Sequence, residues 1–110
     1  MKSMNKVQLI GYLGKDPEFK ELKNGQMMAY MRLATNHWFH PKGGEPTKHT
    51  EWHGVSLWGQ EQIKKIRNYI IKGSHVLIEG RIAYRTYTNK QGEKKSVTEI
   101  KADYLVDLDR

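Results

Sequence analysis

The sequence of 110 residues contains no cysteine, only three prolines and no long apolar run. Without cysteine, disulfides, thiol nucleophiles and cysteine-ligated zinc sites are excluded, and the chain suits a reducing compartment. Neither the ~20 apolar residues of a membrane-spanning helix nor the apolar stretch of a signal peptide is present. We therefore expect a soluble, cytoplasmic protein without a membrane partner, stabilised by packing and by oligomerisation.

Acidic residues are also few relative to basic ones. Lys and Arg number 19 against 12 for Asp and Glu, so the formal net charge is +7. This excess favours a polyanionic partner, with nucleic acid ahead of an anionic membrane. The length suits one domain with one core, which we place at residues 4–108, leaving short termini at 1–3 and 109–110.

Alternating apolar residues and turn signals predict five strands and one helix. Lys23-Asn24-Gly25 is typical of a hairpin turn, and the prolines and glycines within residues 37–48 predict a flexible loop. Ile63, Ile66 and Ile70 form a helical stripe that Gly73 is expected to end. The strands are predicted at residues 5–13, 27–36, 50–58, 74–88 and 97–108.

Three strands, a short helix and two further strands form the element order of a Greek-key barrel of the oligonucleotide-binding (OB) type. A ferredoxin-like fold would need a second helix. We therefore predict an all-β, five-stranded OB-fold barrel with one short helix between the third and fourth strands. On the strand over residues 74–88, the side chains expected to point to the core are Val76, Ile78, Ile82 and Tyr84.

Strand alternation places aromatic and basic side chains together on the outer face. Val55 and Leu57 must point to the core, so Trp52 and Trp58 lie outside, roughly 20 Å apart along the strand. Flat rings that stack on unpaired bases, combined with cations for the phosphates, are what single-stranded nucleic acid requires. The full predicted DNA-binding set is Tyr30, Arg32, Trp38, Phe39, Trp52, Ser56, Trp58, Arg81, Arg85, Tyr87 and Lys90.

Four segments carry a resemblance to a known family. The first is Asn5-Lys6-Val7 with Gly11 and Leu13-Gly14-Lys15-Asp16-Pro17-Glu18, and the second is Leu33-Ala34-Thr35. The third is Thr50-Glu51-Trp52-His53 with Trp58-Gly59, and the fourth is Gly73-Ser74 with Val76 and Ile78-Glu79-Gly80. In order and over about residues 5–107, they resemble the bacterial single-stranded DNA-binding protein family. The resemblance implies sequence-tolerant binding and protection of single-stranded DNA in replication, recombination and repair, in the cytoplasm and at the nucleoid.

The resemblance also implies an assembly and roles for individual residues. Relatives are homotetramers built as dimers of dimers, around which the DNA wraps. Trp52, Trp58 and Tyr87 match stacking positions, and either Trp38 or Phe39 matches a fourth. Subunit contacts are expected from the first strand and from the histidine after Trp52, which together supply Lys6, Gln8, Ile10 and His53.

One departure from the family concerns the end of the chain. Members usually continue into a glycine-rich and then acidic tail with an apolar tip, which recruits replication and repair enzymes. This sequence stops at Leu108-Asp109-Arg110, so we expect no tail-mediated recruitment.

Three other interpretations compete with this one. A primosomal, replication-restart or RNA-binding OB-fold protein would share the barrel but would not depend on the tryptophans. A metal-dependent nuclease would need converging carboxylates, and the sequence contains no such cluster. His37-x-x-His40 is the nearest approach to metal-ligand spacing and lacks further ligands close by. We therefore expect no catalytic residues, no metal and no cofactor.

Overall fold

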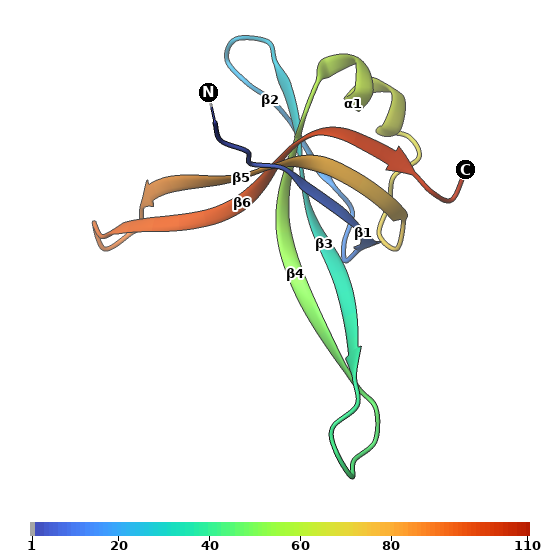
Figure 1. Ribbon diagram of the computed structural model, residues 1–110. Coiled ribbons are helices and arrows are strands. Elements are labelled where there is room, and N and C mark those ends of the chain that lie inside the picture. Colours follow the sequence, from blue (N-terminus) through green and yellow to red (C-terminus); the bar gives the residue numbers. More distant parts are fainter. Residues whose placement is uncertain (1) are drawn as a thin grey trace.

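The computed structural model describes residues 2–110 as a strongly curved sheet from which two long hairpins project (Figure 1). The strands follow the order β1-β5-β6-β4-β3-β2, and a further pairing of β1 with β3 closes five of them into a barrel. The predicted all-β, five-stranded barrel with a single short helix is confirmed. The elements are β1 (Val7–Leu13), β2 (Glu18–Glu21), β3 (Met27–Phe39), β4 (Thr47–Trp58), α1 (Gln60–Ile66), β5 (His75–Thr88) and β6 (Lys94–Asp107).

The core lies inside the barrel and is built by alternate residues of the strands. Each such aliphatic side chain contributes roughly 1.5–3 kcal/mol when it leaves water. Helix α1 packs against β3, β4 and β6, and its Ile63 is fully buried, as the helical stripe predicts. The largest side chains with almost no exposure are Met31, Leu33, Leu57, Ile63, Ile78, Val55 and Val76.

Helix α1 is shorter than the isoleucine stripe predicts. It ends at Ile66, with Arg67 as its C-cap, and the chain then continues through turns to Ile70, which is also buried. Gly73 therefore does not end the helix. The stripe includes Ile63 of the helix and Ile70 of the segment that follows it, and both are buried. The periodicity of the isoleucines alone therefore overestimates the length of the helix.

The β3–β4 hairpin forms one of the two projecting arms (Figure 1). Its antiparallel ladder runs without interruption from Met28 opposite Trp58 to Phe39 opposite Thr47. The prediction of a flexible loop over residues 37–48 is therefore wrong, because only residues 40–46 lie outside the strands. The reason is positional: both prolines and both glycines of the segment fall within this short connection, so none of them interrupts the ladder.

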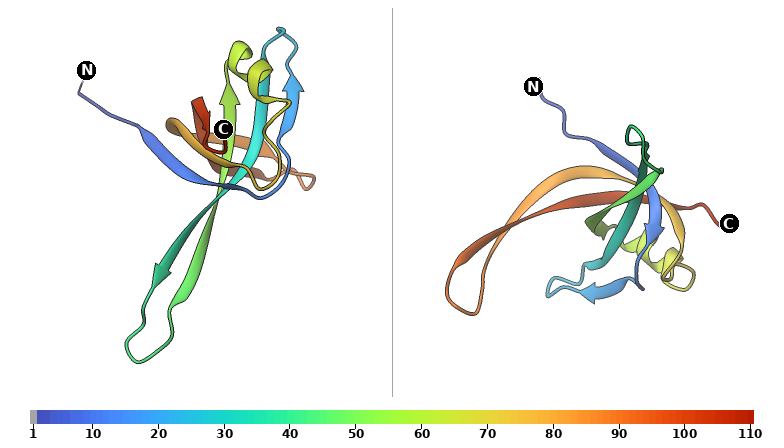
Figure 2. Two further views of the ribbon diagram at one scale, coloured as in Figure 1. Left: turned by 90° about the vertical axis from the view of Figure 1, so that its right-hand side faces the viewer. Right: turned by 90° about the horizontal axis from the view of Figure 1, so that it is seen from below.

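The β5–β6 hairpin forms the second arm, which points in a different direction from the first (Figures 1 and 2). Its turn is closed by Asn89, whose side-chain oxygen accepts hydrogen bonds from the backbone N–H groups of Gln91 and Glu93. Ile82 is 38% exposed and Tyr84 is 73% exposed, so their predicted place in the core is wrong. The alternation continues, but the strand runs past the barrel and leaves these side chains with no core to enter.

A short strand, β2, was not expected. Glu18 to Glu21 pair with Tyr30 to Met27, and the turn between them contains Gly25 at a φ of 85°, a conformation that favours glycine. The predicted hairpin turn is therefore present but joins β2 to β3. Phe19 anchors β2 by packing against the core, a single apolar residue too isolated to predict a strand.

Candidate nucleic-acid interface

The even-numbered residues of β3 and β4 are directed to the outer side of the barrel. Ala34 lies opposite Trp52, Arg32 opposite Gly54, and Tyr30 opposite Ser56. The intervening residues Met31, Leu33 and Val55 are fully buried, so alternation turns their neighbours outward. The structure therefore places Tyr30, Arg32 and both strand tryptophans on the face that the sequence predicts.

Two glycines let the aromatic rings lie close to the backbone of this face. A side chain at Gly14 would overlap the six-membered ring of Trp52, and a Cβ atom at Gly54 would lie 2.8 Å from the Tyr30 hydroxyl. Tyr30, Arg32 and Trp52 line an open pocket of about 510 Å³ together with Gly14 and Lys15. A half-exposed indole beside a guanidinium and a phenol can stack on a base while cations reach its phosphate.

Ser56 is the one predicted DNA-binding residue that the structure removes from the surface. Its exposed fraction is 1%, and it lies between two larger residues, Tyr30 directly opposite on β3 and Lys101 beside it on β6. Its hydroxyl oxygen accepts a hydrogen bond of 3.1 Å from the Trp58 indole nitrogen. The prediction that Ser56 contacts DNA is therefore corrected: the residue supports Trp58.

Trp58 lies in a second groove, of about 480 Å³, with three cationic neighbours. These are Lys6, Arg81 and Lys101, and the Lys101 ammonium lies 4.7 Å from the centroid of the Trp58 ring. Glu79 and Asp103 also line this groove. The sequence analysis predicted Arg81 as a DNA-binding residue. It predicted Lys6 as a subunit contact, and that role stays a prediction.

Lys101 is the residue that the sequence reasoning missed. Ile100 and Ala102 are both buried. Strand alternation, which the sequence analysis used for other strands, would therefore have predicted that Lys101 points outward. Its position beside Trp58 has no sequence signal, because it depends on the parallel pairing of β4 with β6, which sets Lys101 next to Ser56.

The sequence left open whether Trp38 or Phe39 stacks on DNA, and the β3–β4 arm directs these two rings to opposite faces. Trp38 has the parity of Arg32 and Tyr30 along β3 and lies opposite Lys48, whereas Phe39 points to the other face and lies opposite Thr47. Both rings are substantially exposed. The strand register thus extends the aromatic and basic face through Trp38.

The β5–β6 arm carries the remaining predicted residues. By alternation Arg81, Arg85 and Tyr87 share a face, and Tyr87 lies opposite Lys95. Arg85 Nε lies 3.7 Å from Glu99 Oε1, so part of its charge is already matched by a carboxylate. Lys90 is exposed in the turn at the tip of the arm.

The structure gathers these residues into separate groups. Trp52 lies with Tyr30 and Arg32, and Trp58 lies with Lys101 and Arg81. Trp38 and Tyr87 lie on different arms that leave the barrel in different directions (Figures 1 and 2). A chain that reached all of them would have to bend across the barrel surface.

The residues predicted for subunit contacts lie partly on the outer side of β1. Ile10 is 55% exposed and stands in register with Leu77 of β5, which in turn pairs with Val106 of β6. Next to them the Tyr12 ring stacks on His75, with centroids 4.5 Å apart. Gln8 donates a hydrogen bond to Glu79. The outer surface of β1, β5 and β6 thus has an apolar centre at Ile10, Leu77 and Val106 that is bordered by polar side chains.

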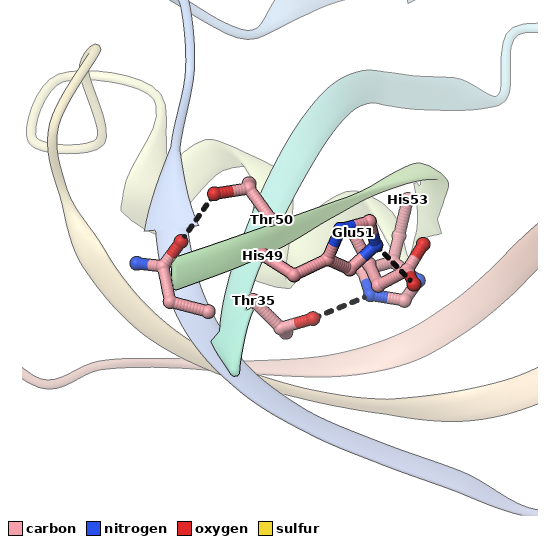
Figure 3. A network of polar contacts seen from close by, with 6 residues as sticks. Thr35, His49, Thr50, Glu51 and His53 are labelled. Carbon is pink, nitrogen blue, oxygen red and sulfur yellow. Dashed lines mark hydrogen bonds and ion pairs between the residues drawn. The ribbon is translucent and has the colours of Figure 1, made fainter. Parts of the chain in front are cut away.

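His53 and the other histidine of β4, His49, each make a polar contact with a neighbouring side chain (Figure 3). The His53 ring nitrogen lies 2.8 Å from the Thr35 hydroxyl, and His49 lies 2.9 Å from Glu51. Thr50 donates to the side chain of Asn36 at 2.7 Å. Within residues 2–110, no three His, Asp or Glu side chains gather in a way that could hold a metal ion, and no helix is long and apolar enough to cross a membrane.

Comparisons with known proteins agree with this geometry. "Single-stranded DNA-binding protein 1" of Chlorobaculum tepidum is 42% identical over 100 residues, which cover 90% of this chain and 61% of the relative. This chain therefore spans about three-fifths of the length of that relative. The solved structure "Plasmodium falciparum SSB complex with ssDNA" matches with a TM-score of 0.84 at 34% identity, covering 98% of this chain and 97% of the other.

The structural match identifies the barrel as an OB fold. The family described as "Single-strand binding protein family" matches residues 4–108. The family and the Chlorobaculum tepidum relative are both described as binding proteins. With nearly the whole described chain matched, the protein belongs to the single-strand binding protein family.

Proposed function

We propose that this protein binds single-stranded DNA with little sequence preference and protects it during replication, recombination and repair. One observation carries the proposal: Trp52 and Trp58 lie on one outer face, each beside cationic side chains, Arg32 for the first and Arg81 and Lys101 for the second. The membership of the family supports the same function.

Two physical terms would supply the affinity. Stacking of unpaired bases on exposed rings contributes about 1–3 kcal/mol per base. Neutralisation of phosphates by Lys and Arg releases condensed counterions, so binding weakens as salt rises. A duplex hides the faces of its bases, and therefore only single strands can use both terms.

Sequence tolerance follows from the same geometry. Every base has a flat face, so a ring that stacks does not distinguish one base from another. Readout of sequence would instead need hydrogen bonds to base edges. In each pocket an indole ring stands beside cations, Arg32 in one and Arg81 and Lys101 in the other.

The experiment that tests the function is a titration of tryptophan fluorescence with oligo-dT, matched RNA and duplex DNA at two salt concentrations. We expect strong quenching by oligo-dT that exceeds the effect of both competitors and weakens at higher salt. Unchanged emission with oligo-dT would contradict the proposal. Stronger binding of RNA would favour the RNA-binding or replication-restart alternative.

We further propose that the protein is a homotetramer, a dimer of dimers, that acts in the cytoplasm at the nucleoid. The apolar patch around Ile10 and Leu77 on the outer surface of β1 and β5 supports contacts between copies, because exposed apolar patches often mark protein interfaces. The roles of Lys6, Gln8 and His53 in those contacts remain part of this proposal. Sedimentation at several protein concentrations would test it.

A further inference from the structure

We propose that Lys101 is a DNA-contacting residue that works together with Trp58. Its ammonium group holds the indole in place in the free protein and neutralises the phosphate of the nucleotide that stacks there. The inference rests on the proposed single-stranded DNA binding and assigns a role to a residue outside the predicted set.

Contacts on two sides define the position of the Trp58 ring. Its Nε1–H donates to the Ser56 hydroxyl at 3.1 Å, and the Lys101 Nζ atom lies 4.7 Å from the ring centroid. A cation within about 6 Å of an indole centroid is attracted by the electrons of the ring. The indole is therefore held by an edge contact and a face contact before any nucleotide arrives.

The strand pairings explain why Lys101 is the residue that reaches Trp58. The parallel ladder sets Lys101 beside Ser56, two residues before Trp58 on β4. On its other side β6 pairs with β5, which sets Lys101 opposite Arg81. Lys101 thus lies between the tryptophan of one strand and the arginine of another.

The charge of Lys101 is available for a phosphate. Among residues 2–110, the ion pairs join Lys15 to Glu18, His49 to Glu51 and Arg85 to Glu99, so none includes Lys101. Glu79 and Asp103 line the same groove, but Glu79 accepts a hydrogen bond from Gln8. By contrast, Arg85, which the sequence analysis favoured, already has a carboxylate partner.

The experiment compares Lys101→Gln with Lys65→Gln, which removes the same charge from the solvent-exposed side of α1. Binding of labelled oligo-dT is followed by anisotropy at several salt concentrations. Lys101→Gln should weaken binding about three- to tenfold and lower the slope of log affinity against log salt by about 0.7. Lys101→Arg should restore both values, and Lys65→Gln should change neither.

Two further measurements separate this role from a general effect of charge. The NMR signal of the Trp58 indole N–H is identified by its loss in Trp58→Phe. In the free protein, Lys101→Gln should shift this signal, whereas Lys65→Gln should leave it in place. In the Trp58→Ala background, Lys101→Gln should reduce affinity by a smaller factor than it does alone. Equal factors in both backgrounds would overturn the link between the two residues.

The outcomes also distinguish this inference from the proposed function. If the unaltered protein fails to bind oligo-dT, the function itself is wrong. If the unaltered protein binds and Lys101→Gln binds equally well with an unchanged salt slope, the function stands and the role of Lys101 is wrong.

Discussion

At the scale of single residues, the candidate interface depends on pairs in which a large side chain lies over a small one. Tyr30 crosses Gly54, Trp52 covers Gly14, and Trp58 is bonded to the buried Ser56. A small partner leaves room for the ring to lie flat against the sheet. Because each ring then loses little conformational freedom on binding, stacking on a base costs less entropy.

Trp58→Ala tests whether this ring carries binding energy. Loss of one stacked base should lower the affinity for oligo-dT by about 1–3 kcal/mol while the barrel stays folded. Tyr69→Ala is the matched control, since Tyr69 is an exposed aromatic residue beyond α1 whose ring faces Arg110. Anisotropy of labelled oligo-dT gives the affinities, and thermal unfolding gives the stabilities. A melted Trp58→Ala protein would contradict its placement on the outer face.

Gly54→Ala tests the close approach of Tyr30 to the backbone. The new methyl group would lie 2.8 Å from the Tyr30 hydroxyl but 3.6 Å from Cζ, so the hydroxyl must move while the sheet keeps its form. We expect weaker binding of oligo-dT and a change in unfolding free energy below about 1 kcal/mol.

The companion variant Gly54→Ala with Tyr30→Phe removes the hydroxyl that collides. Its affinity should therefore match that of Tyr30→Phe alone. Gly54→Ala could instead weaken binding of oligo-dT by the same factor in the Tyr30→Phe variant as in the unaltered protein. In that case the collision with the Tyr30 hydroxyl is not the cause of the weaker binding.

At the scale of elements, the two arms are the parts that reach beyond the barrel. Each is a two-stranded ladder with exposed side chains on both faces. Trp38 and Tyr87 therefore depend on strand pairing, rather than on a core, for their orientation. The arms can present rings far from the barrel because their backbone hydrogen bonds are satisfied within each hairpin.

Two substitutions on β5 test where the barrel ends. Ile78→Ala removes a fully buried side chain and should lower the unfolding free energy by about 2–5 kcal/mol. Tyr84→Ala removes a larger but mostly exposed side chain and should change it by no more than about 0.5 kcal/mol. Urea denaturation measures both. A large loss in Tyr84→Ala would restore the original expectation that Tyr84 belongs to the core.

At the scale of the whole molecule, two surfaces of the barrel have different characters. Two pockets carry the rings and cations of the candidate interface, and a patch around Ile10 and Leu77 on β1 and β5 presents apolar residues. If copies associate through this patch, the pocket around Trp52, which shares no residue with it, stays free in each subunit, so several binding sites would serve one strand of DNA.

Ile10→Glu tests the association without touching the core, because Ile10 points out of the barrel. A carboxylate buried between copies without a partner is strongly unfavourable, so the variant should sediment as a smaller species with a cooperative unfolding transition retained. Lys20→Gln, on the exposed edge strand β2, lowers the net charge by the same one unit and is the control for the change of charge. If Ile10→Glu and the unaltered protein have the same mass in solution, the proposed interface is wrong.

The sequence by itself determined the elements whose signals are local. Alternation around Val55 and Leu57 turned Trp52 and Trp58 outward, and the isoleucine stripe identified the helix that covers the barrel. The element order then indicated the closed barrel. These features could be predicted because periodicity depends only on neighbours in the chain.

Only the tertiary structure decided the features that depend on distant segments. The barrel ends partway along β5, so Ile82 and Tyr84 follow the correct alternation and still remain outside the core. Ser56 is covered by its neighbours, although its strand position points outward. Lys101 reaches Trp58 because the parallel pairing of β4 with β6 sets it beside Ser56, a residue far away in the chain, and a contact of that kind leaves no periodic trace in the sequence.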